Sequence, residues 1–257
     1  MIRLRVEHLT KRFGGLVANS DVTFSINAAG VSAVIGPNGA GKTTLFNMIS
    51  GFSPPTEGRV FFNEQEITGL EPEEIATRGL VRTFQLTQLF QNQSVLENVM
   101  IGRHVRTKAG VIGALLRPRW VRDEERQTEQ RSHELLDLVG LGAQADMLAS
   151  TLPYGQQRLL EIARAMATDP QLLMLDEPAA GLNHEETEKL SQIIRRISDL
   201  GTTVLLIEHD MRLVMNTADH IVVLNFGRKI AEGSPSHIQA DKDVIEAYLG
   251  GTEMLDA

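Results

Sequence analysis

The segment 36–43, Gly-Pro-Asn-Gly-Ala-Gly-Lys-Thr, is the feature that most constrains the fold of this chain. It follows the apolar run from Val31 to Ile35, which is typical of a buried strand, and it leads into an amphipathic stretch from about Lys42 to Ser50. Glycines let such a loop curl so that successive backbone N–H groups point at phosphate oxygens, and a helix N-terminus adds positive potential there. The pattern therefore predicts a strand, a phosphate-binding loop and a helix.

Two side chains at the end of this loop suit a nucleoside triphosphate. Lys42 is expected to reach the β- and γ-phosphates, and the Thr43 hydroxyl is expected to ligate Mg²⁺. A glycine-rich turn before a helix is the alternative, but strand, Lys-Thr and helix occurring together disfavour it. The other residues expected to bind the nucleotide here are Gly36, Pro37, Asn38, Gly39, Ala40, Gly41 and Thr44.

A second apolar strand, from Gln171 to Leu175, leads into two carboxylates, Asp176 and Glu177. A buried strand has no reason to end in paired acids unless they meet a cation or polar chemistry. Asp176 is suited to holding Mg²⁺, and Glu177 is suited to orienting and polarising an attacking water. A strand that ends in Asp-Glu is by itself a common loop start, and the phosphate loop upstream favours the functional interpretation.

Two further residues follow predicted strands. Gln85 ends the strand from Leu80 to Phe84 and is placed to bridge metal and water, although a lone glutamine carries no signal. His209 follows the strand from Val204 to Glu208, one strand beyond the carboxylates, and this position suits a donor to a γ-phosphate oxygen. A histidine after a strand is more often an ordinary surface residue.

Short apolar strands alternate with amphipathic stretches, which predicts an α/β fold. Helices are expected from Pro72 to Arg78 and from Glu185 to Leu200, and a terminal hairpin around residues 226–228. The middle of the chain is mostly helical in pattern. One domain over residues 1–257 is therefore predicted, with a nucleotide-binding core at about 1–85 and 161–235, an inserted helical subdomain at about 86–160 and a C-terminal tail at about 236–257.

Composition excludes several classes of function. The formal net charge of -8 argues against a large basic surface for nucleic acid, and the absence of cysteine excludes disulfides and cysteine-based sites. No apolar run approaches the roughly 20 residues that span a bilayer, and the alternating start reads as a strand. We therefore expect a peripheral protein with no signal peptide and no transmembrane segment.

With these residues in view, the sequence resembles the ATP-binding cassette (ABC) family. Residues 152–158, Leu-Pro-Tyr-Gly-Gln-Gln-Arg, look like the family's signature, usually Leu-Ser-Gly-Gly-Gln. Residues 180–183, Ala-Gly-Leu-Asn, resemble the loop usually read Ser-Ala-Leu-Asp. The resemblance implies an α/β P-loop NTPase (RecA-like) core of ABC type with an antiparallel β portion and an inserted helical subdomain, which hydrolyses ATP with Mg²⁺.

The resemblance also implies roles for single residues. Phe13 matches the aromatic residue that stacks on adenine, Gln85 the glutamine that senses Mg²⁺ and the membrane partner, and His209 the switch histidine. In this family two cassettes face each other head to tail, so that each nucleotide lies between the phosphate loop of one and the signature of the other. The signature residues Tyr154, Gly155 and Gln156 are thus expected to contact a nucleotide across a dimer.

Three positions depart from the family pattern. Pro153 replaces a serine, Tyr154 a glycine and Asn183 an aspartate, so the hydroxyl donor of the signature and the loop contact of the aspartate are in question. The variant signature, the runs 176–183 and 208–211 and the ending 246–250 together look like the ATPase of branched-chain (hydrophobic) amino-acid uptake systems, specifically the longer of their two cassettes. That subfamily implies a second cassette, preferably a different chain, two membrane permeases, an external solute-binding protein and a place on the cytoplasmic face of the inner (plasma) membrane.

The alternative functions are a soluble cassette protein, another transport ATPase and a P-loop kinase. Soluble cassette proteins of DNA repair or translation usually carry coiled-coil insertions or two cassettes, and this chain has neither. Lipopolysaccharide-export ATPases keep Ser-Gly-Gly in the signature, and urea or amide uptake is a further transport alternative. A non-transport P-loop kinase would leave residues 152–158 unexplained.

Two segments of the helical part have two interpretations each. The basic segment from Arg103 to Arg126, interleaved with apolar residues and Trp120, is either a solvated lobe or a surface near anionic headgroups or permeases. Leu86, Leu89 and Phe90, which follow Gln85, either anchor the helical lobe or line a groove for a short permease helix.

Overall fold

The computed structural model describes residues 1–83, 89–106 and 118–249. The chain divides into two compact units: Met1–Arg82, Gln171–Ala180 and Thr187–Ala257 form unit 1, and Thr83–Pro170 and Gly181–Glu186 form unit 2. Unit 2 extends to Pro170, whereas the sequence placed the return to the core near residue 161. The difference arises because the helix that carries the signature packs with the other helices of unit 2.

Unit 1 contains a six-stranded sheet. Its central strands are parallel and β10 pairs antiparallel to β9, which confirms the predicted terminal hairpin. The three middle strands are buried along their whole length, as expected for a parallel sheet covered on both faces. The strand order is β10 (Arg228–Gly233), β9 (His220–Asn225), β3 (Val31–Ile35), β8 (Thr203–Ile207), β7 (Leu172–Asp176) and β6 (Leu80–Arg82).

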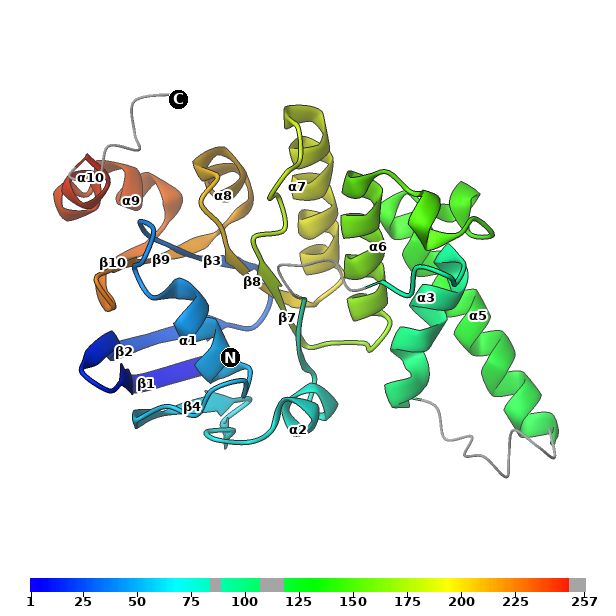
Figure 1. The fold of residues 1–257 in the computed structure, drawn as a ribbon, viewed down its shortest axis with the longest axis horizontal. Coiled ribbons are helices and arrows are strands. Elements are labelled where there is room, and N and C mark those ends of the chain that lie inside the picture. Colours follow the sequence, from blue (N-terminus) through cyan, green and yellow to red (C-terminus); the bar gives the residue numbers. More distant parts are fainter. Residues whose placement is uncertain (84–88, 107–117, 250–257) are drawn as a thin grey trace. The chain divides into compact units, whose positions relative to one another are not determined.

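A second sheet of unit 1 is antiparallel, as the fold class requires. Its order is β2 (Leu16–Asn27), β1 (Ile2–Phe13), β4 (Glu57–Phe62) and β5 (Gln65–Glu66). Helix α1 (Lys42–Ile49) lies between the two sheets in Figure 1, and its Leu45, Phe46 and Ile49 are fully buried in one cluster with residues of both sheets. Burial of each such side chain contributes about 1.5–3 kcal/mol, so the start of α1 is firmly fixed.

Two of the remaining helices of unit 1 match those expected at 72–78 and 185–200, and the others had no predicted counterpart. The remaining helices are α2 (Pro72–Thr77), α7 (His184–Asp199), of which residues 187–199 belong to this unit, α8 (Met211–Thr217), α9 (Pro235–Ala240) and α10 (Lys242–Leu249). Leu190, Ile194 and Ile197 of α7 are fully buried while its charged residues face outward. The expected C-terminal tail therefore contains two helices.

Unit 2 is built from helices. Its main helices are α3 (Val95–Gly102), α5 (Arg119–Val139) and α6 (Tyr154–Met166), which pack pairwise, and its 3-10 turns are η1 (Arg103–Arg106), η2 (Gly142–Gln144) and η3 (Ala149–Thr151). Ser94 and Glu97 form a capping box at the start of α3. Leu136 and Leu160 are among the fully buried side chains that hold α5 and α6 together.

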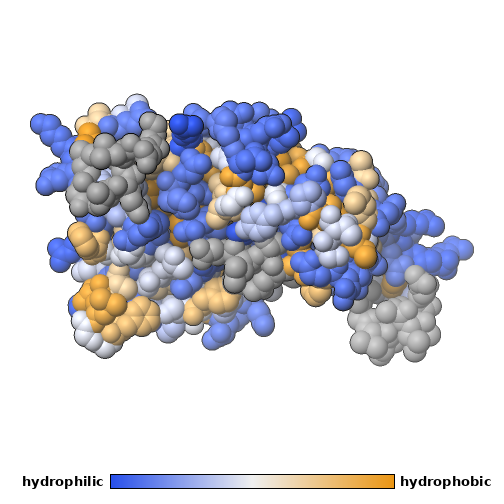
Figure 2. All heavy atoms as spheres, turned by 45° about the horizontal axis from the view of Figure 1, so that its top comes forward, coloured by the Kyte–Doolittle hydropathy of each residue, from blue (hydrophilic) through white to orange (hydrophobic). Residues whose placement is uncertain are grey.

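The outer surface is mostly polar. Figure 2 shows hydrophilic side chains over much of the face in view, with apolar residues in scattered patches. Of the helices that the structure describes, none combines the length and the apolar character needed to cross a membrane.

Candidate functional site

Three neighbouring strands of the parallel sheet bring the predicted motifs of unit 1 to one edge. β3 runs into the loop 36–43, β7 ends at Asp176, and β8 is followed by Glu208 and His209. The order β3-β8-β7 makes these strands adjacent, and parallel strands place their carboxyl ends at the same edge. Ligands of open α/β sheets bind at this edge.

The phosphate loop is held by backbone crowding. Gly36 has φ +151°, and a side chain there would overlap the carbonyl oxygen of Leu224. Gly41 has φ +94°, and a Cβ there would lie 2.5 Å from the carbonyl oxygen of Ala18. These two positions therefore require glycine for space as well as for conformation.

The electrostatics of this loop suit an anion. Lys42 is only 8% exposed, and its Nζ donates hydrogen bonds to the carbonyl oxygens of Gly36 at 2.6 Å and Pro37 at 3.0 Å, so its ammonium lies within the curl of the loop. α1 begins at Gly41 without a side-chain cap and without an acidic residue in its first turn. Its positive end is thus left for a ligand, and Thr43 lies exposed beside it.

Asp176 is held by an arginine that sequence reasoning missed. The carboxylate is 3% exposed, and its Oδ2 accepts a hydrogen bond of 2.6 Å from Nη2 of Arg82 at the end of β6. Nη1 of Arg82 donates to Asn47 Oδ1 at 2.7 Å and to Ser50 Oγ at 3.0 Å, both at the C-terminal end of α1. Arg82 therefore orients the metal-binding candidate and ties it to α1.

Glu177 and His209 follow two adjacent strands. Glu177 has the left-handed φ of +46°, and its N–H donates to the carbonyl oxygen of Ile207 at 3.0 Å. A non-glycine residue rarely adopts this conformation, and such strain clusters at active sites. The His209 side chain is 61% exposed and thus free to face a ligand.

The donors at this edge fit Mg²⁺. Across residues 1–83, 89–106 and 118–249, no three His, Asp or Glu side chains gather as a metal-binding group. Mg²⁺ commonly binds through one or two protein oxygens together with substrate phosphates and waters. Asp176 and Thr43 are the oxygen ligands available for that arrangement, and Gln85, the third predicted ligand, lies outside the described residues.

Phe13 lies at the end of β1 with half of its side chain exposed. Nζ of Lys11 lies 5.0 Å from the centre of its ring. An exposed ring beside a cation is not a core residue, and its position is open to stacking by a base.

The signature candidates lie in unit 2 at the start of α6. Pro153 occupies the N-cap and contributes no side-chain hydrogen bond. The Tyr154 ring packs against Gly181, where a Cβ would lie 3.1 Å from Tyr154 Cε1, and its hydroxyl accepts a hydrogen bond of 3.2 Å from Arg158 Nε. Gly155 faces Glu186, since a Cβ there would lie 2.5 Å from Glu186 Oε1.

Asn183, the third departure from the family pattern, caps α7. Its N–H donates to Glu186 Oε2 at 2.9 Å, and its Oδ1 accepts from the Glu186 N–H at 3.0 Å. This reciprocal pair is a capping box, in which asparagine serves as well as aspartate. The substitution therefore preserves the local structure of the loop.

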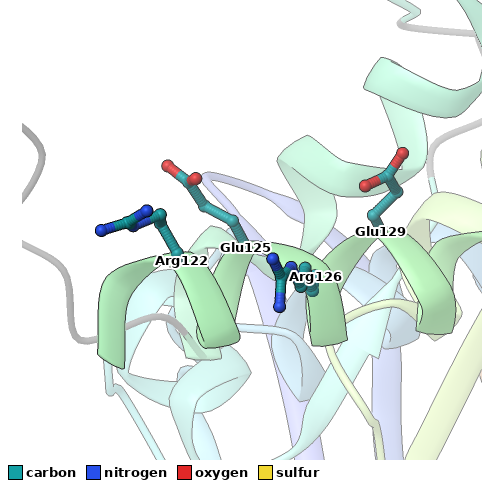
Figure 3. A pocket seen from close by; sticks show the side chains of 4 residues that line it. All are labelled: Arg122, Glu125, Arg126 and Glu129. Atoms are coloured by element: carbon teal, nitrogen blue, oxygen red, sulfur yellow. The ribbon is translucent and has the colours of Figure 1, made fainter. Parts of the chain in front are cut away.

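The described part of the basic segment mixes charges of both signs. Residues 103–106 and 118–126 hold five arginines against three carboxylates, and Arg103 is paired with Asp169 at 3.0 Å. A hollow of about 480 Å³ runs along α5, lined by Arg122, Glu125, Arg126 and Glu129 (Figure 3). Alternating charges from a single helix do not select an anionic surface, which favours the solvated interpretation for these residues.

β3, the phosphate loop and α1 follow one another along the chain, and β7, which ends in a carboxylate, lies in the same sheet on the other side of β8. This arrangement defines a P-loop nucleoside triphosphatase. The family model described as "ABC transporter" matches residues 19–180, and the model "Branched-chain amino acid ATP-binding cassette transporter" matches residues 228–253. The chain therefore belongs to the ATP-binding cassette ATPases of ABC transporters, in the branched-chain amino acid group.

Individual relatives agree with this membership. The chain is 47% identical to the high-affinity branched-chain amino acid transport ATP-binding protein BraF of Pseudomonas aeruginosa, over 96% of this chain and 97% of that protein. It is 45% identical to LivG of Escherichia coli, of the same description, with the same coverage. A crystal structure of an ATP-binding cassette of an ABC transporter in its ADP conformation superimposes with a TM-score of 0.85 at 36% identity, over 97% of this chain and 99% of that one.

Proposed function

We propose that this chain hydrolyses ATP to drive the uptake of branched-chain or other hydrophobic amino acids through partner permeases. The likeness to BraF over nearly the full length of both chains carries the proposal. The match of residues 228–253 to the branched-chain group adds to it, because this segment lies outside the general cassette match. The chain acts as the longer of two different cassettes, on the cytoplasmic face of the inner membrane.

Glu177 is the general base in this proposal. It follows Asp176 directly, and its backbone is pinned to the neighbouring strand β8 through Ile207. Lys42 and the N–H groups of the phosphate loop hold the phosphates, and His209 donates to a γ-phosphate oxygen. Phe13 stacks on the adenine, which tolerates any base and so gives little selectivity between ATP and GTP.

Asp176 and Thr43 would hold Mg²⁺, with Gln85 as a further ligand, and the ion would supply positive charge close to the phosphate oxygens. Arg82 keeps one oxygen of Asp176 occupied, which leaves the other oxygen of the carboxylate for the metal shell. This arrangement suits a metal that is shared between the protein and its substrate.

A second cassette completes the site in this proposal. A solved structure at 25% identity is described as the dimer of a bacterial ABC transporter cassette, with a TM-score of 0.75 to this chain. The N-terminus of α6, with Tyr154, Gly155 and Gln156, offers backbone N–H groups to the nucleotide of the partner cassette. Since Pro153 supplies no hydroxyl, this recognition rests on backbone groups and Gln156.

The permeases dock on an apolar surface of unit 2. The large side chains Phe90, Met147 and Leu148 are about half exposed. Their two segments are joined by hydrogen bonds from Ala149 N to the Gln93 carbonyl oxygen and from Ser150 N to that of Gln91. A short amphipathic permease helix is a suitable occupant, because helices dock through apolar anchors surrounded by polar groups.

Glu177→Gln tests the catalytic assignment. It should retain ATP binding and lower kcat at least about 100-fold, the scale of a lost general base. Glu188→Gln, an exposed glutamate of α7, is the matched control and should leave hydrolysis unchanged. ATPase assays and labelled-ATP titrations measure both effects, and near-normal steady-state hydrolysis by Glu177→Gln would refute the assignment.

Transport of labelled leucine, isoleucine and valine by the assembled complex tests the substrate class. Urea or amide uptake without amino-acid uptake, or co-purification with lipopolysaccharide-export permeases, would contradict the proposal.

Phe90→Asp should abolish co-purification with the permeases while the free chain melts normally, since Phe90 is exposed. Leu89 is half buried and a poorer probe, and Leu200→Asp, on an exposed site of unit 1, is the matched control.

A further inference from the structure

Glu208 is a fully buried carboxylate at the end of β8, between the two loops that carry Glu177 and His209. Its Oε1 accepts a hydrogen bond of 2.8 Å from the N–H of Ala179. Its Oε2 accepts from the N–H groups of His209 at 3.1 Å and Asp210 at 3.3 Å. One side chain thus bonds the backbone two residues after Glu177 and the backbone of His209 itself.

Burial of a charged carboxylate at this position costs desolvation free energy. Burial raises the pKa of Glu208, and the three backbone N–H donors and the His209 ring partly oppose that shift. Its ion-pair contact among the described residues is with the His209 ring, 4.0 Å away and mostly exposed. A neutral side chain would avoid the desolvation cost, so the burial calls for a property that only a carboxylate offers.

That property is the pair of acceptor oxygens. An ionised carboxylate accepts on both sides, whereas a glutamine amide has one acceptor oxygen and one N–H₂ donor. A glutamine at this position would therefore point its N–H₂ donor at the backbone N–H groups of either the Glu177 turn or the His209 loop. Of the side chains that could stand here, only those of aspartate and glutamate carry a pair of acceptor oxygens. The side chain that spans the distance to Ala179 in this structure is the longer one, glutamate.

The loop after β7 has two ties to β8. Glu177 N donates to the Ile207 carbonyl oxygen, and the Ala179 N–H donates to Glu208. Between these ties Glu177 adopts its left-handed φ, and Ala180 N donates back to the Glu177 carbonyl oxygen at 3.1 Å. Glu208 therefore restrains a strained turn whose first residue is Glu177.

We propose that Glu208 is a positioning residue that locks the Glu177 turn and the His209 loop into one rigid arrangement for hydrolysis. The proposal rests on the roles assigned above to Glu177 and His209. Glu208 acts on the hydrolysis step and not on ATP binding, because its hydrogen bonds end on the loops of the general base and the histidine. Misplacement of reacting groups by about 1 Å can cost roughly 100-fold in rate.

Glu208→Gln in the full-length chain is the principal test, with Glu208→Ala as a second variant that removes both acceptors. In the assembled transporter, kcat should fall roughly 10- to 100-fold with KM within about twofold. The Kd of the chain for ATP should also stay within about twofold, because the phosphate loop is untouched. Hydrogen exchange at the Ala179 amide should become at least about tenfold faster in Glu208→Ala, since that N–H then loses its acceptor.

Asp219→Ala is the matched control for Glu208→Ala. Asp219 Oδ2 accepts from the N–H of Val31 at 2.8 Å, which is the same kind of tie at the other end of β3. This variant should accelerate exchange at Val31, leave exchange at Ala179 unchanged and keep kcat normal. The control thus separates the loss of any carboxylate-to-backbone tie from the loss of the tie at Glu177.

Two results would overturn the proposal. Unchanged kcat in both Glu208 variants would show that the tie does not serve hydrolysis. A parallel rise of the ATP Kd with a fall in melting temperature would show that Glu208 merely supports the fold. Glu177→Gln is measured alongside, and if it fails to lower kcat the proposed function itself fails, whatever the Glu208 variants do.

Discussion

The phosphate loop and the signature segment use opposite means to present backbone N–H groups. In the loop, the backbones of β9 and β2 occupy the places where side chains at Gly36 and Gly41 would lie. In the signature, the Tyr154 ring lies over Gly181, and a Cβ at Gly155 would meet the flexible end of the Glu186 side chain. The loop is therefore fixed by main chain, and the signature is adjustable through side chains.

This difference explains where the sequence departs from its family. The loop keeps every fixed position, because a neighbouring backbone cannot move aside for a new Cβ. The signature replaces serine by Pro153 and glycine by Tyr154, and the new ring finds space over Gly181 and a hydrogen bond from Arg158. What the signature needs for an anion is the N-terminus of α6, and that survives both changes.

Gly36→Ala should have the largest effect on the loop side of this comparison. The new Cβ would overlap the Leu224 carbonyl oxygen, and φ +151° is strained for alanine, so the loop must change shape. ATP affinity should fall at least about 100-fold, a loss of roughly 2.7 kcal/mol or more. Isothermal titration with ATP measures it, and parental affinity would show that this glycine is not required.

Asn19→Leu should have the next largest effect and the opposite sign. Asn19 is fully buried in β2 against Gly41, and neither atom of its amide has a hydrogen-bond partner in the described part of the chain. An unsatisfied buried amide costs about 1–3 kcal/mol, so a leucine, which has the same branching and no polar atoms, should stabilise the protein by up to about that amount. Thermal unfolding tests this, and a lower melting temperature would mean that the amide is satisfied after all.

Gly155→Ala tests the signature side. Its Cβ would displace the Glu186 carboxylate, which can rotate away but then loses its hydrogen bond from the N–H of Asn183. The expected cost is that of a lost helix cap, about 0.5–2 kcal/mol of unfolding free energy. Chemical denaturation measures the loss, and Glu186→Gln, which keeps an acceptor at this position, is the control. Failure of Gly155→Ala to fold would show that this side chain cannot adjust.

Much of this architecture could be predicted from the sequence. The runs that became β3, β7 and β8 are fully buried, so each reads as a short, mostly apolar segment. They lead into the phosphate loop, Asp176-Glu177 and Glu208-His209, respectively. The sequence pattern does not reveal β2, because Asp21 has φ +57° and shifts the alternation of buried and exposed side chains along the strand. Asn19 is therefore buried at an odd position, whereas Val22 and Phe24 are buried at even ones.

The partners within the site were harder to predict. Arg82 lies 94 residues from Asp176, and no spacing rule joins an arginine at the end of one strand to an acid at the end of the next. Glu208 did leave a signal, since it is a charged residue at the end of an apolar strand directly before His209. That signal resembles the start of an exposed loop, and only the fold reveals that the side chain turns inward.

Pro153→Ser should have the smallest effect, because two terms oppose each other. A serine at the N-cap of α6 can accept a hydrogen bond from an N–H of the first turn, which adds about 0.5–2 kcal/mol. Loss of the proline ring gives the unfolded chain more freedom, which removes about 0.4–1 kcal/mol. The net change in unfolding free energy should therefore lie between a loss of about 0.5 and a gain of about 1.6 kcal/mol, and hydrolysis should stay normal if the backbone N–H groups carry recognition. Denaturant unfolding and ATPase assays measure the two effects. A tenfold or larger rise in kcat would show that the missing hydroxyl limits hydrolysis, and that recognition by the signature depends on side chains and not on backbone N–H groups alone.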